Sequence, residues 1–374
     1  MTRHTPAEVF PPGEFIREEL EARGWTQADL AFILSRPLQS VNEIIAGRKA
    51  VTPDTAKGLA DAFGTSAEFW MNLESAYRLA QSPSGGGAVA LRAKMYSVAP
   101  VKEMVKRGWI DEAPDAAALE NELLRFFEVA SLDEAPNLCI AAKMGANYTE
   151  PSPAQLAWFA RAKKLARAVD AAAFKQQAFE QGLADLRQLI GSEHNLRRAP
   201  RILADVGVRL VILEHLPRTR IDGAVIWLDG VTPAVALSLR LDRIDNFWFT
   251  LFHELMHVRH GDKWSLDEAL VGDDAVPTEQ KPDYEQRADR EAADMLIPSR
   301  EIENFILRTR PLYSKKKVVQ FAHRIRVHPG IVVGQLQRRR EINYSHSREM
   351  LVKVRSLVRG AALSDGWGDV PPVR

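Results

Sequence analysis

The sequence predicts a mainly α-helical protein with a small β-sheet, in which an N-terminal five-helix domain is joined to a later α+β domain. Residues 13–81 contain five short amphipathic runs separated by turn residues, as in a small helical bundle. Between residues 208 and 238, short β-branched and apolar runs are bounded by Gly, Pro and Asp, which is typical of strands. A stretch of Ser, Pro and Gly at residues 82–87 separates the two parts.

The amino-acid composition excludes several classes of protein. Of the 374 residues, 46% are hydrophobic, which is enough to bury a core and excludes disorder over most of the length. The formal net charge of +1 excludes a polycation that binds nucleic acid by bulk charge. Cys139 is the one cysteine, so a disulfide framework is excluded and a buried apolar role is expected for it. Because the start lacks a signal pattern and no apolar run approaches about 20 residues, we expect a soluble cytoplasmic protein without a membrane span.

The N-terminal helices are expected to form a helix-turn-helix domain, since helices of about ten residues joined by tight turns match that motif. Thr26 is expected to cap the second helix, because Asp29 stands three positions later. Leu30 and Ile33 are expected to pack this helix on the first one. Gly47 supplies a left-handed residue at the end of the third helix. The five helices are expected at residues 13–23, 26–34, 38–46, 53–63 and 66–81.

The third helix has the pattern expected of a DNA-reading helix. Val41, Ile44 and Ile45 form its apolar inner face. The opposite face carries short polar side chains that can reach base edges in the major groove, and a basic pair follows as phosphate contacts. The alternative is a helical bundle that uses this pattern only for packing, with Asn42 as a solvated surface residue. The expected DNA-binding residues are Gln27, Arg36, Gln39, Ser40, Asn42, Arg48 and Lys49.

Four segments of this block, at residues 12–15, 25–27, 45–53 and 69–70, have the order and spacing of a known family. The block resembles HigA-type antitoxins of the Xre helix-turn-helix family. The resemblance implies a repressor that binds operator DNA as a homodimer, with a neighbouring toxin as a further partner. In one departure, Arg36 and Pro37 replace the small polar cap before the third helix. Proline suits the first helical position, so the capping hydrogen bond is expected to come from elsewhere.

The charge of the N-terminal block is a separate constraint on DNA binding. Residues 1–80 contain 8 Lys and Arg against 11 Asp and Glu. Without a wide basic face, affinity is expected to rest on a few contacts and on dimerisation.

The second half is predicted to combine helices with a small sheet. Its helices are expected at residues 154–169, 171–190, 244–259 and 283–296, and its strands at residues 208–213, 224–228 and 234–238.

The helix expected at residues 244–259 contains the motif H-E-x-x-H. Residues four apart on a helix project about 40° from each other, so His253 and His257 can share one tetrahedral ion. Glu254 lies beside such an ion without binding it, where it can take a proton from the attacking water as the catalytic residue. The alternative is a chance match of two surface histidines.

A catalytic zinc ion needs a third protein ligand and an open position. The candidate ligand is Glu285, 28 residues after His257, on a helix whose alanines allow close approach to another helix. Asp289 lies one turn later and is the candidate residue that orients a histidine from outside the ligand set. Solvated acids are the alternative reading for both.

The stretch from Phe247 to Pro298 resembles the ImmA/IrrE-type metallopeptidases, with a looser likeness back to Arg201. The resemblance implies a gluzincin-like α+β domain that binds Zn²⁺ and cleaves helix-turn-helix repressors. The chain departs from the family pattern at Glu291, where an aromatic is usual, and at Arg287, where an acid is frequent. The first departure leaves the packing of this helix open, and the second favours Glu285 as the ligand.

Two further features stay open. His260 or His328 could polarise a scissile carbonyl, although a structural or solvated role is the alternative for each. Residues 300–359 contain 15 Lys and Arg against 4 Asp and Glu. This basic segment represents either solvated helix ends or an additional surface for nucleic acid or an acidic partner.

Two hypotheses follow for the whole chain. The first is a DNA-binding transcriptional regulator with a zinc-dependent endopeptidase domain that acts on a regulatory protein, such as a repressor or its own N-terminal domain. The second is a non-enzymatic antitoxin or repressor whose zinc-binding domain senses or binds a partner. The expected domains are a helix-turn-helix domain (1–82), a linker (83–92), a helical connecting region (93–150), the peptidase domain (151–300), a basic helical region (301–360) and a flexible tail (361–374).

Overall fold

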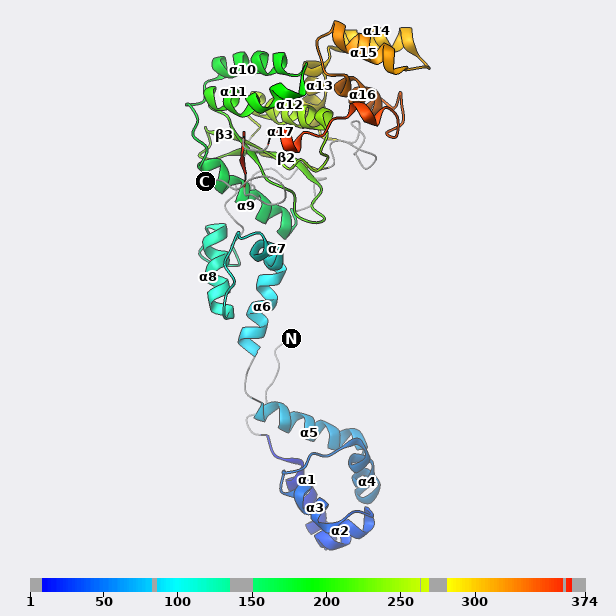
Figure 1. Ribbon diagram of the computed structural model, residues 1–374. Coiled ribbons are helices and arrows are strands. Elements are labelled where there is room, and N and C mark those ends of the chain that lie inside the picture. Colours follow the sequence, from blue (N-terminus) through cyan, green and yellow to red (C-terminus); the bar gives the residue numbers. More distant parts are fainter. Residues whose placement is uncertain are drawn as a thin grey trace. The chain divides into compact units, whose positions relative to one another are not determined.

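The computed structural model describes residues 9–82, 86–134, 151–262, 264–268, 281–358 and 361–364. The chain forms two compact units, Met1–Ala90 and Leu91–Arg374 (Figure 1). Cys139, residues 135–150 of the expected connecting region and residues 365–374 of the expected tail lie outside the described residues. No helix in the described part of the chain is long and apolar enough to cross a membrane.

The first unit consists of the five predicted helices, and each helix end lies within one residue of its expected position. Thr26 and Asp29 form the predicted capping box, and Gly47 has the predicted positive φ of 70°. A small residue is required at Gly13, because an added Cβ would lie 2.0 Å from the carbonyl oxygen of Ile45. The helices are α1 (Pro12–Arg23), α2 (Gln27–Ile33), α3 (Leu38–Ile45), α4 (Pro53–Phe63) and α5 (Ala67–Gln81).

The core of the first unit follows the predicted apolar faces except at the end of α2. Leu30 is fully buried, as expected, and packs with Ile16, Leu20 and Trp70. The expected packing of Ile33 is wrong, since its side chain is 43% exposed. Ile33 is the last residue of α2, where the helix turns the side chain away from the core.

The second unit begins inside the expected linker. Residues 86–92 belong to helix α6, since the Ala and Leu residues after Gly87 favour a helix. Helices α6 to α9 bury their apolar faces in one cluster around Trp158 and Phe126. They span Gly86–Val98 (α6), Val101–Lys106 (α7), Ala116–Phe127 (α8) and Pro153–Arg167 (α9).

A five-stranded mixed sheet forms the centre of the second unit, with the strand order β4-β2-β3-β1-β5. β1 pairs in parallel with β3 and β5, whereas β2 pairs antiparallel with β3 and β4. The strands are β1 (Arg209–Ile212), β2 (Ile221–Trp227), β3 (Pro233–Leu237), β4 (Trp264–Glu268) and β5 (Leu363–Ser364), of which the last two were not predicted.

The three predicted strands are buried on both faces, and alternate residues face different helices. Ala224 and Ile226 of β2 belong to the cluster formed with α9. Val225 and Trp227 belong to the other cluster, which contains α12 (Ile244–His260). The sheet therefore separates two hydrophobic layers, and the H-E-x-x-H helix lies against one of its faces.

The larger cluster also includes the helices that follow α12. α10 starts at Gln176 rather than at the expected residue 171. The basic region expected at residues 301–360 contributes Ile302, Phe321 and Leu336 to this same core. The remaining helices are α10 (Gln176–Leu189), α11 (Ala199–Asp205), α13 (Asp283–Leu296), α14 (Ser299–Thr309), α15 (Lys315–Arg324), α16 (Pro329–Arg338) and α17 (Arg355–Val358).

Candidate functional site

Helix α12 is buried along nearly its whole length, from Ile244 to Val258. It packs between the sheet and helices α13 and α16. Gly261 ends the helix with a φ of 68°, which a residue with a side chain would adopt only at a cost. The chain therefore reverses directly after the motif, and this brings Asp262 back beside it.

Three buried side chains from α12 and α13 meet in a group that could hold a metal ion. The candidate ligand atoms of His253, His257 and Glu285 all lie within 4.8 Å of one another. The two Nε2 atoms are 3.1 Å apart, and the Glu285 oxygens lie 3.2 Å from that of His253 and 3.4 Å from that of His257. The histidines are fully buried and Glu285 is 2% exposed. These are the three residues that the sequence predicted as metal ligands.

A second carboxylate faces the other ring nitrogen of His253. Asp289 Oδ1 lies 3.0 Å from His253 Nδ1. Its other oxygen lies 2.8 Å from both Lys281 Nζ and an Arg338 nitrogen. Burial by itself raises the pKa of Asp289, but the contact with His253 and the two cations outweigh burial and hold that pKa well below its ordinary value. Asp289 is thus an anion whose place is fixed by three neighbours.

His257 has a matching partner that the sequence did not suggest. Asp262 Oδ2 lies 2.9 Å from His257 Nδ1, and Arg287 lies 3.1 Å from the same carboxylate. Burial opposes ionisation, but the hydrogen bond with His257 and the charge of Arg287 lower the pKa of Asp262. Gly261 could have indicated Asp262 from the sequence. A glycine that ends a helix in the left-handed conformation predicts that the next residue folds back toward the last turn of the helix.

Glu254 is fully buried next to the ligand group, beneath strand β2. Gly223 of β2 makes room for its carboxylate, because an added Cβ would lie 2.3 Å from Glu254 Oε1. The same Cβ would lie 2.9 Å from Thr250. The pairing of β2 with β4 shifts register between Ile221 and Gly223. Gly223 and the register shift of β2 thus lie at the point where the sheet faces Glu254.

The residues present fit a catalytic zinc ion. Two imidazole nitrogens and one carboxylate oxygen form one of the ligand sets that such sites use. Each histidine has its Nδ1 beside a carboxylate, which fixes the ring so that Nε2 faces Glu285. The arrangement can therefore hold a divalent ion next to an acid, Glu254, that does not belong to the ligand group.

The two histidines that were candidates for polarising a carbonyl have structural partners. His260 Nε2 lies within hydrogen-bond distance of Glu291, at 2.9 Å, and Glu291 is the residue that departs from the family pattern. His328 caps α16, where its Nδ1 accepts the Gly330 N–H at 3.1 Å. Burial lowers the pKa of His328. Neither contact involves the ligand group.

The expected DNA-reading residues lie on and around α3. Gln27, Gln39, Arg48 and Lys49 are exposed, whereas Arg36 and Asn42 are partly buried. Gln39 Nε2 donates to Glu43 Oε1 at 3.2 Å. Ser40 is 8% exposed, and Lys49 donates to its hydroxyl at 2.8 Å.

Two details of α3 differ from expectation. Pro37 occupies the N-cap rather than the first helical position, and no side chain caps the helix. A proline whose φ is −58° and whose ψ is 137° forms the residue before a helix as readily as its first residue. Asn42 is not the solvated residue of the alternative reading, since its Oδ1 is shielded and has no hydrogen-bond partner in the described part of the chain.

Comparison with known families identifies both parts of the chain. Residues 16–70 match the family described as Helix-turn-helix. Residues 207–336 match the family described as IrrE N-terminal-like domain, which is a peptidase family. The chain therefore contains an Xre-type helix-turn-helix domain and an IrrE N-terminal-like domain, as the sequence resemblances predicted. The second match includes the ligand group and Glu254.

Individual relatives resemble only part of the chain. Virulence-associated protein I of Dichelobacter nodosus is 39% identical over 69 residues, 18% of this chain and 64% of that protein. The uncharacterized HTH-type transcriptional regulator YddM of Escherichia coli K12 is 28% identical over 71 residues, 19% of this chain and 76% of that protein. This chain thus spans about two thirds to three quarters of these relatives.

Solved structures with similar segments include a Pseudomonas aeruginosa protein in complex with its operator DNA. It is 37% identical, with 21% of this chain and 87% of that chain covered and a TM-score of 0.20. An addiction module antidote protein of the HigA family from Coxiella burnetii is 31% identical, with a TM-score of 0.19. The similarity covers 29% of this chain and 98% of that chain.

Proposed function

We propose that the chain is a transcriptional regulator that binds operator DNA through its first unit and hydrolyses a peptide bond with its second. The observation that carries the proposal is the buried group of His253, His257 and Glu285 beside a separate buried acid, Glu254. A purely structural metal site has no need of such an acid. His253, His257 and Glu285 would hold the ion, and Zn²⁺ supplies Lewis-acid activation of water and of the scissile carbonyl when bound.

The chain's own residues would carry the proton transfers. A Glu254 carboxylate oxygen accepts a proton from the attacking water and returns it to the leaving amine. Asp289 and Asp262 hold the two imidazole rings in the orientation that directs Nε2 to the ligand group. Gly223 leaves the space that the Glu254 carboxylate needs.

The DNA-binding half of the proposal rests on α3 and its surroundings. Gln39 lies exposed at the start of the helix, where side chains reach base edges. Arg36, Arg48 and Lys49 would contact phosphates and Gln27 the adjacent backbone, while Ser40 acts through its bond to Lys49. We propose that the unit binds as a homodimer, and that the cytoplasm is where it meets its DNA.

The proposed substrate is a regulatory protein, either a helix-turn-helix repressor or the chain's own first unit. The test incubates the zinc-loaded full chain with such repressors, with and without promoter DNA, and reads new termini by mass spectrometry. Cleavage that requires zinc and Glu254 supports the endopeptidase. Zinc binding without cleavage of any repressor or of the chain itself would favour the second function, a partner-binding antitoxin whose partner is a toxin.

A further inference from the structure

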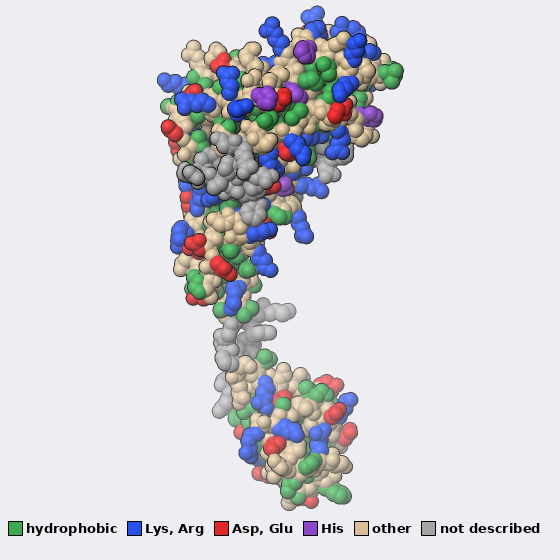
Figure 2. All heavy atoms as spheres, viewed as in Figure 1, with side chains coloured by type: hydrophobic (Ala, Val, Ile, Leu, Met, Phe, Trp, Pro, Cys, Tyr) green, Lys and Arg blue, Asp and Glu red, His purple; other side chains and the backbone are tan. Residues whose placement is uncertain are grey.

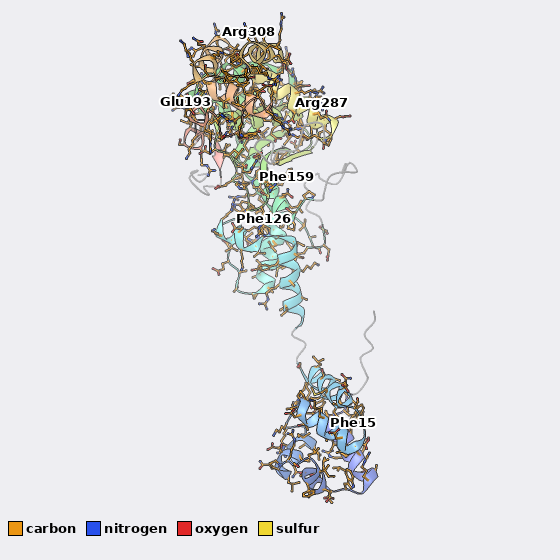
Figure 3. The ribbon with its side chains drawn as sticks, turned by 90° about the vertical axis from the view of Figure 1, so that its right-hand side faces the viewer. Phe15, Phe126, Phe159, Glu193, Arg287 and Arg308 are labelled. Atoms are coloured by element: carbon orange, nitrogen blue, oxygen red, sulfur yellow. The ribbon has the colours of Figure 1, made fainter. Side chains whose placement is uncertain are left out.

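The hairpin formed by α14 and α15 carries most of the excess positive charge near the end of the second unit. Residues 299–326 contain 8 Lys and Arg against 2 Asp and Glu. Its inner side is packed, since the rings of Phe305 and Phe321 stack with centroids 4.2 Å apart. Arg308 lies on the outer side of α14, and basic side chains gather over this end (Figures 2 and 3).

Few of these cations are neutralised by the chain itself. Glu301 pairs with Arg324, and Glu341 pairs with Arg310. Lys315 lies 3.7 Å from Glu349, but both side chains are more than half exposed, so this contact is weak. No carboxylate in the described ranges lies within ion-pair distance of five others, namely Arg300, Arg308, Lys316, Lys317 and Arg326. These five side chains are exposed.

Folding does not explain this arrangement. Lys315, Lys316 and Lys317 occupy the first turn of α15, where the helix dipole disfavours positive charge. The apolar face that anchors the helix is formed by Val318, Phe321 and Ala322 and needs no lysine. The lysines therefore add repulsion without contributing to the core, which is the pattern of a surface kept for an anionic partner.

We infer that this hairpin, the basic hairpin (residues 299–326), is a second DNA-binding surface that contacts the phosphate backbone beside the operator. The inference rests on the proposed DNA binding by the first unit. That unit has three more acidic than basic residues between residues 1 and 80, and Lys49 is already bonded to Ser40. The first unit therefore makes few phosphate contacts of its own. DNA bound to the first unit is held at a high effective concentration for a basic surface on the same chain.

Salt dependence tests the inference, because each phosphate contact releases counterions. We would measure binding of the full chain to a long promoter duplex and to a random duplex between about 50 and 200 mM salt. The variant replaces Lys315, Lys316 and Lys317 by Gln. Its slope of log affinity against log salt should be shallower than that of the wild type by about 0.9 for each lost contact, so by about one to three, on both duplexes.

The matched control removes three cations from α11 and from the 3-10 helix before it (Glu193–Arg198), on elements away from the hairpin (Figure 1). Arg197, Arg198 and Arg201, replaced together by Gln, change the net charge equally and should leave the slope unchanged. If the lysine variant lost stability, a second variant with Arg308 and Arg326 replaced by Gln would be used instead.

Three outcomes would count against the inference or its premise. Equal slopes for the wild type and both hairpin variants would overturn DNA binding by the basic hairpin, while DNA binding by the first unit would stand. Equal losses in the hairpin and control variants would also overturn it, because bulk charge would then be the cause. If the wild type bound no promoter even at low salt, the proposed function itself would fail.

Discussion

The two units hold their functional side chains in opposite ways. In the second unit, the candidate ligands are at most 2% exposed, and each is fixed by partners from other elements. In the first unit, Gln39 and Lys49 are exposed, and among the described residues their side chains form hydrogen bonds to Glu43 and Ser40, which lie within ten positions along the chain. Changes in the buried group should therefore couple chemistry to folding, whereas changes at Gln39 should alter DNA binding alone. The difference between the two units leads to four expected results.

The largest effect is expected for Glu254→Gln. The amide has nearly the same size and fits beneath Gly223, so the fold and the metal should remain. Because the amide cannot accept the proton of the attacking water, cleavage should fall by about 10²–10⁴. Cleavage and metal content would be measured on the same preparation. Undiminished cleavage would exclude Glu254 as the base, and joint loss of metal and cleavage would make it a ligand.

A smaller effect is expected for Asp262→Asn, which removes the charge beside His257 Nδ1. The zinc affinity should fall by about 10–100-fold, measured by competition with a chelator. The matched control is Glu291→Gln, which removes the same kind of charge beside His260 but outside the ligand group. Equal zinc affinities of the two variants would show that Asp262 does not orient its histidine.

Gly223→Ala should destabilise the second unit by about 1–3 kcal/mol, because the new methyl group enters the space of the Glu254 carboxylate. The cost should shrink in a Glu254→Ala background, where that space is vacant. Thermal unfolding of the two single variants and the double variant forms a double-mutant cycle. An unchanged cost in both backgrounds would mean that Gly223 is required for another reason.

In the first unit, Gln39→Ala should weaken promoter binding by about 1–3 kcal/mol. Both non-specific DNA binding and the thermal stability should stay nearly unchanged. Gln81→Ala, an exposed glutamine at the end of α5, serves as the control. An equal loss on promoter and random duplexes would contradict base reading by Gln39.

The sequence predicted the parts of each unit that depend on local pattern. Helix ends in the first unit follow capping residues such as Thr26, and the H-E-x-x-H spacing determines one face of α12. Glu285 was within reach of prediction because the alanines of α13 indicate close helix packing.

Contacts that depend on tertiary packing could not be predicted. Asp262 reaches His257 because the chain reverses at Gly261, and Arg338 reaches Asp289 because α16 packs on α12. Gly223 has meaning only once β2 lies over Glu254. The edge strand β4 has only five residues, of which three are polar, so its own pattern was too short to predict the pairing with β2. Likewise, the exposure of Ile33 follows from its place at the end of a seven-residue helix.

The metal content of the purified full chain decides whether the buried group of His253, His257 and Glu285 is a metal centre. After loading with zinc and removal of excess, elemental analysis of the wild type should give about one Zn²⁺ per chain. His253→Ala should lose most of it, because two ligands make an incomplete site, and should still bind promoter DNA through the first unit. Equal zinc content in wild type and variant, or no bound metal in the folded wild type, would contradict the assignment of the buried group as a metal centre.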